Sequence, residues 1–151
     1  NNQQGSMAAA GKLWLQSSGL NNDNGLLQSG RDMSLDLQNG RLSNRSDSTP
    51  GGILSQGTLT LNSGVLDNTQ GIISVAADAQ LNTGNIDNTE GQIQVVGTAV
   101  INVINGLITN THGLIRSGAN LAIKARQLIN RETQADNRGV EGTSVTLEGG
   151  I

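Results

Sequence analysis

The chain has 151 residues, a formal net charge of −3 and no cysteine. This length suits one domain of ordinary size, and the absence of thiols excludes disulfides and thiolate metal sites. The small net charge gives no reason to expect a nucleic-acid partner, and no apolar run approaches the roughly 20 residues of a membrane-spanning helix. Trp14 is the single aromatic residue, beside 21 glycines and one proline. A core of stacked aliphatic side chains is therefore expected.

The first segment, residues 1–15, is polar and small and is hard to place. Only Leu13, Trp14 and Leu15 alternate as a strand would, so that Trp14 is expected to point away from the core or to cover the end of a stack. No signal peptide is visible at the start. We interpret the chain as a segment of a longer polypeptide.

From residue 20 to residue 130 a single unit recurs, most clearly as VLDNTQGIISVAADAQLNTG at 65–84 and NIDNTEGQIQVVGTAVINVING at 85–106. In each unit an aliphatic residue stands two places before an asparagine, and a glycine usually follows the asparagine by three places. Short alternating apolar runs come next. The steps from asparagine to asparagine are about 20–24 residues, a spacing typical of stacked coils. The asparagines are Asn22, Asn44, Asn68, Asn88, Asn110 and Asn130.

This pattern predicts an all-β fold, a parallel β-helix of about six coils with three short strands in each. The six asparagines would lie above one another as a ladder, because like stacks on like. Asparagine suits such a turn because it tolerates left-handed backbone, and the glycines are expected to supply positive φ where the strands bend. A right-handed coil follows from the general preference of parallel crossovers.

Two segments interrupt the regular frame. Arg45–Pro50 is an insertion that contains the only proline, and it is expected to form an outward loop. After Asn130, residues 131–142 are polar and charged, and Thr143–Leu147 resumes strand character. We therefore predict one β-helix over 1–151, with clear repeats at 20–130 and atypical ends at 1–15 and 131–151.

The repeats resemble a known family. The stretches GLLQSGRDMSLDL, LDNTQGIISVAADAQLNTGNIDNTEGQIQV and INGLITNTHGLIRSGANLAIKARQLINRE are similar to the shaft repeats of filamentous haemagglutinins. Similar repeats build the exoproteins of contact-dependent growth inhibition and other two-partner-secretion adhesins. The family's N-terminal Asn-Pro-Asn motif is missing, and no toxin-like domain is visible.

The resemblance implies a right-handed β-helix in a bacterial surface filament associated with virulence. It also implies secretion through an outer-membrane β-barrel transporter and no cofactor. The expected function is therefore a non-catalytic shaft that presents distal binding or toxin domains. The exposed ends of such a stack are expected to favour end-to-end self-association.

Two other functions are open. A receptor- or glycan-binding module would use either the Arg45–Pro50 loop or a basic surface made of Arg116, Lys124, Arg126 and Arg131. A polysaccharide-cleaving enzyme would use the stacked carboxylates Asp67 and Asp87, although both are also expected in Asx-type turns. The only histidine, His112, is expected to be a solvated turn residue rather than a metal ligand.

Overall fold

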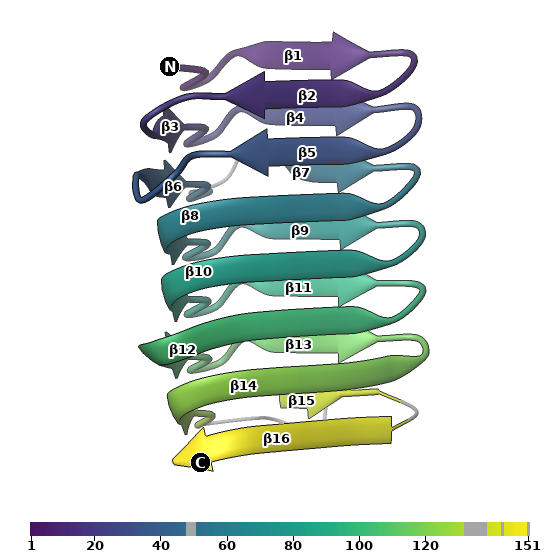
Figure 1. The fold of residues 1–151 in the computed structure, drawn as a ribbon. Helices are drawn as coiled ribbons and strands as arrows, with labels where there is room; N and C mark the ends of the chain where they lie inside the picture. The colour runs from purple at the N-terminus through teal and green to yellow at the C-terminus, as the bar shows by residue number, and fades with distance from the viewer. Residues whose placement is uncertain (48–50, 132–138, 143, 151) are drawn as a thin grey trace.

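Short runs of alternating residues form strands that wind into a right-handed parallel β-helix in the computed structural model (Figure 1). The structure describes residues 1–47, 51–131, 139–142 and 144–150. Within these ranges the regular structure is entirely β, and no helix capable of crossing a membrane occurs there. The predicted fold class is confirmed.

One strand from each coil enters a seven-stranded parallel sheet on one side of the stack. Because every neighbour is the equivalent strand of the next coil, chain order is also spatial order (Figure 1). The strands are β1 (Ser6–Ala9), β4 (Leu26–Ser29), β7 (Gly52–Ser55), β9 (Ile72–Val75), β11 (Gln92–Val95), β13 (Leu114–Ser117) and β15 (Gly139–Glu141).

The second sheet covers the rest of each coil. In the first two coils it has separate short strands, β2 (Leu13–Gln16) with β3 (Leu20–Asn21), and β5 (Met33–Asp36) with β6 (Arg41–Ser43). In the later coils the second and third expected strands join into one long strand. The long strands are β8 (Leu59–Asp67), β10 (Ala79–Asp87), β12 (Ala99–Thr109) and β14 (Asn120–Ile129), and β16 (Ser144–Gly150) continues the sheet.

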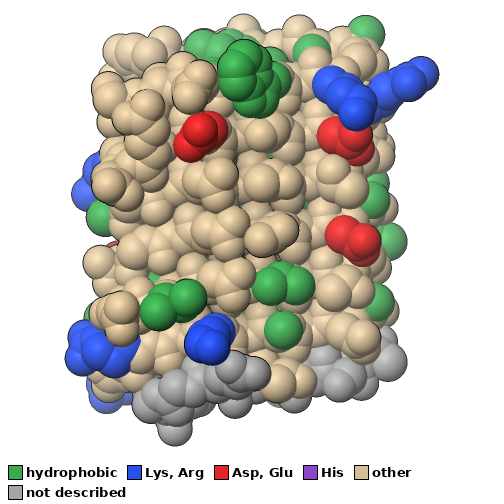
Figure 2. Space-filling model, in the orientation of Figure 1, with side chains coloured by type: hydrophobic (Ala, Val, Ile, Leu, Met, Phe, Trp, Pro, Cys, Tyr) green, Lys and Arg blue, Asp and Glu red, His purple; other side chains and the backbone are tan. Residues whose placement is uncertain are grey.

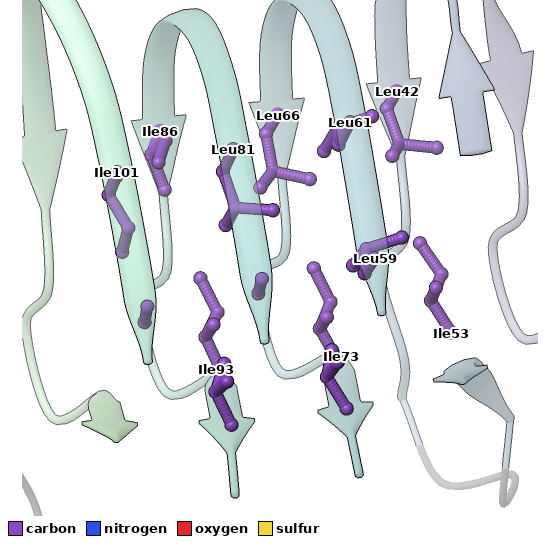
Figure 3. Packing of buried hydrophobic residues seen from close by; sticks show 14 of the residues in the cluster. Leu42, Ile53, Leu59, Leu61, Leu66, Ile73, Leu81, Ile86, Ile93 and Ile101 are labelled. Carbon is purple, nitrogen blue, oxygen red and sulfur yellow. The ribbon is translucent and has the colours of Figure 1, made fainter. Parts of the chain in front are cut away.

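Aliphatic side chains from successive coils fill the interior between the sheets. Leu66 is paired in register with Leu42 on one side and with Ile86 on the other, and all three are essentially buried. Figure 3 shows these columns, in which each side chain packs on its equivalent one coil away. Such stacking makes a dry core from Leu, Ile, Val, Met and Ala alone.

The stack begins before the first predicted coil. Strand β1 pairs in register with β4, from Ser6 opposite Leu26 to Ala9 opposite Ser29, so residues that looked irregular belong to the same architecture. On β2, Trp14 points outward and its side chain is 68% exposed. Of the predicted loop Arg45–Pro50, residues 48–50 lie outside the described part, as do 132–138 of the polar stretch after Asn130.

The turn geometry differs from the prediction. Positive φ occurs at the residue two places after the ladder asparagine, at 52–57° for Gln4, Asn24, Gln70, Glu90 and His112. The ladder asparagines and the glycines that follow them do not have positive φ, so the expectation of left-handed backbone at those positions was wrong.

These glycines are needed because the backbone of the preceding coil comes too close to leave room for a side chain, and not because they adopt positive φ. A Cβ on Gly91 would overlap the carbonyl oxygen of Asn68 in the preceding coil, and one on Gly71 would overlap that of Asn44. The backbone of one coil thus passes directly over the turn of its neighbour.

Removal of residues 68–87 is expected to leave a folded protein, because it joins Asp67 to Asn88 and deletes one whole coil. Removal of residues 68–77 alone deletes β9 and places unlike residues above one another, so the core columns are lost. Circular dichroism and urea unfolding compare the two deletions. Equal stability of both would contradict the stacked-coil description.

Gly91→Ala is expected to lower the free energy of unfolding by about 2–4 kcal/mol, because the added methyl group meets a fixed backbone carbonyl. The matched control is Gly11→Ala, where an added Cβ has no atom within 4 Å. The control should change stability by less than about 0.5 kcal/mol. Thermal unfolding of the two variants measures the difference.

Candidate functional site

A ladder of asparagine side chains, buried at every member except the exposed Asn130, runs along one corner of the stack. The six predicted members are hydrogen bonded in sequence, each donating from Nδ2 to Oδ1 of the next. The donor–acceptor distances are 2.8 Å for Asn22–Asn44, 2.7 Å for Asn44–Asn68, 2.7 Å for Asn68–Asn88, 2.7 Å for Asn88–Asn110 and 2.8 Å for Asn110–Asn130.

A seventh member, Asn2, extends the ladder toward the N-terminus. Its Nδ2 donates to Asn22 Oδ1 at 2.6 Å, and the residue is 6% exposed. Gly5, three places later, was the signal that could have identified it.

The amides of Asn22, Asn68 and Asn88 also tie two backbone segments together. Asn68 Nδ2 lies 3.2 Å from the carbonyl oxygen of Gly71 in its own turn and 3.2 Å from that of Gln92 in the next coil. Asn88 makes the equivalent contact with the Leu114 carbonyl at 3.0 Å. Among the described residues, Ser63 Oγ is the only buried side-chain polar atom without a partner. The ladder is therefore a satisfied buried network, which fixes the register of the coils.

The two carboxylates weighed as catalytic groups are register partners in adjacent coils. Asp67 Oδ1 accepts from Thr69 N at 3.1 Å and from Thr69 Oγ1 at 2.7 Å, and Asp87 Oδ1 accepts from the corresponding atoms of Thr89 at 3.0 and 2.7 Å. Asp67 Oδ2 also accepts from the Arg41 guanidinium. Both carboxylates thus cap Asx-type turns.

The four cations of the expected basic surface come from different parts of one coil. Arg116 lies on β13 in the seven-stranded sheet and is 3.6 Å from Glu141. Lys124 and Arg126 lie on β14 in the other sheet, where Arg126 Nε donates to the Asn105 carbonyl at 3.3 Å. Arg131 follows β14 in the ladder turn, and its carbonyl accepts from His112 N at 3.0 Å.

No cluster of metal-ligating side chains occurs in the described part of the chain. His112 is half-buried in the turn before β13, with φ 52°, at the position that Gln70 and Glu90 occupy in other coils. The residue type at this position varies between coils while the backbone does not. The turn geometry therefore does not depend on the imidazole.

Turns on the opposite edge of the long sheet are capped by carboxylates from the neighbouring coil. Asp32 Oδ1 accepts from Thr58 N at 3.2 Å, and Asp78 Oδ1 accepts from Thr98 N at 2.8 Å. The ammonium group of Lys12, 3.0 Å away, and the Thr58 N–H hold the pKa of Asp32 below its ordinary value. These caps are exposed, so they contribute little beside the buried ladder.

A second row of amides lies outside the core on the long sheet. Asn102 Nδ2 donates to Asn82 Oδ1 at 2.9 Å, and Asn82 Nδ2 donates to Asn62 Oδ1 at 2.9 Å. The row therefore runs in the opposite direction to the buried ladder. The spacing of apolar residues does not reveal this row, because outward-facing positions carry no apolar signal.

The repeat pattern has a counterpart among protein families. A family model described as "Haemagglutinin repeat" matches residues 1–46, 34–110 and 96–149. The chain belongs to the haemagglutinin repeat family. No curated protein and no solved structure matches it. Membership in this family favours the shaft of a filamentous haemagglutinin-type protein, secreted or held at the cell surface, and agrees with the stacked coils described above.

Asn68→Ala is expected to lower the free energy of unfolding by about 2–5 kcal/mol, because Asn44 Nδ2 loses an acceptor and Asn88 Oδ1 loses a donor inside the core. Asn82→Ala removes an amide from the outer row and is the matched control. It should cost less than about 1 kcal/mol, because water can replace its partners. Urea unfolding of both variants tests this difference, and equal losses would count against the ladder as the main polar constraint.

Proposed function

We propose that this chain is a non-catalytic length of shaft within a large exoprotein that carries distal binding or toxin domains away from a bacterial surface. The observation that carries the proposal is the unbroken ladder from Asn2 to Asn130, in a chain matched by haemagglutinin repeats along nearly all of its length. Successive coils are joined by two sheets and, from Asn2 to Asn110, by a buried amide as well.

The arrangement suits a spacer because each coil adds length in one direction. The two ends of the chain lie at opposite ends of the stack (Figure 1). Each coil advances the stack by about 4.8 Å, the spacing of hydrogen-bonded strands. Bending would have to break the ladder and the sheets together, and this makes the stack stiff.

The sequence also suits export through an outer-membrane transporter of the two-partner-secretion type. A chain without cysteine cannot be trapped by disulfides before it crosses. Contacts link adjacent coils, so that folding can proceed coil by coil on the outer side. This mode of secretion and the carriage of an adhesin or growth-inhibition toxin are parts of the proposal.

The haemagglutinin repeat family is typically structural, and the local chemistry agrees with that role. Asp67 and Asp87 are both engaged in turn hydrogen bonds, and the cations of the expected basic surface are divided between two sheets and a turn. These features favour a passive shaft over a binding module or an enzyme.

The test compares two variants of the parent exoprotein. In the first, Arg116, Lys124 and Arg126 are all replaced by glutamine, which changes the exposed cations and leaves the core intact. In the second, residues 68–77 are deleted, which breaks the stack. A shaft predicts that the first variant retains surface display and target-cell binding and that the second loses both. Flow cytometry with an antibody to the distal domain measures display.

Loss of target-cell binding by the glutamine variant, with display unchanged, would instead favour a binding module. Retention of full display and binding by the deletion variant would contradict the shaft.

A further inference from the structure

A straight column of outward-facing side chains crosses the long sheet at one position of five successive coils. Asp36 on β5 pairs in register with Asn62 on β8, Asn62 with Asn82 on β10, Asn82 with Asn102 on β12, and Asn102 with Lys124 on β14. We call these five residues the amide column. Figure 2 shows the face to which they belong, where uncharged surface fills the centre and charged groups lie toward the ends and edges.

Over these five residues the charge is antisymmetric about the middle member. The same register continues to Gln16 on β2 before Asp36 and to Glu148 on β16 after Lys124, two positions that an antiparallel pair sets against each other without opposing like charges. Asp36 lies two coils before Asn82, and Lys124 lies two coils after it. A two-fold axis that lies between two facing sheets at the level of Asn82 and runs parallel to the strands would therefore place Asp36 of one copy opposite Lys124 of a second. The same operation would create the reciprocal pair. A parallel arrangement would oppose carboxylate to carboxylate and ammonium to ammonium, which is unfavourable.

The hydrogen bonds within the column have the same antisymmetry. Its bonds run from Asn102 through Asn82 to Asn62, which leaves the amide N–H groups of Asn62 and the amide oxygen of Asn102 unused within the row. The two-fold axis brings the unused donors of one copy to the unused acceptor of the other. Charge and hydrogen bonding thus select the same antiparallel arrangement.

The surface beside the column is shaped to receive side chains. A shallow groove of about 410 Å³ extends from Gln38 and Asn39, past Asn82 and Gly84, to Ile104. Ile104 is 59% exposed at one end of the groove. The two-fold axis directs Ile104 of each copy to the Gln38–Asn39 end of its partner's groove, so the apolar side chain gains cover.

We propose that the amide column is a self-association surface through which two copies of this chain pair side by side and antiparallel. Lys124 also makes contacts within its own chain, and because it is exposed it can exchange them at small cost. If the chain is a shaft as proposed above, antiparallel pairing joins filaments that project from opposing surfaces. Two shafts that stand side by side on one cell cannot pair in this way.

Charge reversal tests the pairing. Asp36→Lys and Lys124→Asp should each weaken dimerisation at least about tenfold at low salt, because each opposes like charges at both ends of the interface. The double variant should restore it, although it still lacks the Asp36 carboxylate that caps the Gln38 N–H at 3.1 Å. Sedimentation equilibrium measures the dimer dissociation constant, and circular dichroism checks that all variants are folded. Dimers insensitive to both reversals, or a monomer at all concentrations, would overturn the proposal.

Cross-linking gives an independent readout, since the chain has no cysteine of its own. A bifunctional thiol reagent that spans about 10 Å, the spacing of packed sheets, should link two copies of the Asn82→Cys variant. It should also link Asn62→Cys to Asn102→Cys in a mixture, but not Asn102→Cys to itself.

Self-linking of Asn102→Cys would indicate parallel pairing and overturn the proposal. A dimer with twice the monomer's length in small-angle X-ray scattering would indicate end-to-end association and do the same. Either failure leaves the shaft untouched, because display of distal domains does not depend on pairing.

Discussion

Each buried side chain of this protein is stabilised mainly by its own equivalent in the next coil. This constraint is most severe for the asparagine ladder, because an amide buried in an aliphatic interior needs partners for both its oxygen and its nitrogen. The Asn68 oxygen accepts from Asn44 in the preceding coil, and the Asn68 nitrogen donates to Asn88 in the next coil as well as contacting two backbone carbonyls. A coil without an amide there would leave unpaired groups in two neighbours, and so the register of the whole stack is specified by one residue per coil.

The same dependence reaches the backbone. Gly91 must lack a side chain because the Asn68 carbonyl occupies the space where a Cβ would project. The aliphatic columns, the amides and the glycines therefore all require the same register between neighbouring coils, and each reinforces the others. This agreement explains how a chain with a single aromatic residue and small side chains forms an ordered interior.

The fold could be predicted from the sequence because its main signal is repetition. Leu66 and Ile86 occupy equivalent places in two visibly similar copies, and register pairing follows directly from that equivalence. The backbone geometry of the turns could not be predicted from the sequence in the same way. The sequence shows that a glycine follows Asn88 but does not show whether it is there for positive φ or for close approach, and only the position of the neighbouring coil distinguishes the two. The outer row of amides through Asn82 could not be predicted either, since the sequence pattern of a polar residue on a solvated face does not depend on whether the residue has a hydrogen-bond partner. Arg116 and Lys124 are near in sequence but lie on different sheets, because a coil turns between them.

Trp14 gives this molecule an unusual optical property. It is the only tryptophan in a chain without tyrosine or phenylalanine, and it stands on β2 in the first coil. Intrinsic fluorescence excited near the red edge of protein absorption therefore reports on the N-terminal coil alone, whereas far-ultraviolet circular dichroism averages over all strands. A difference between the two melting profiles therefore shows that the N-terminal coil unfolds separately from the rest of the stack.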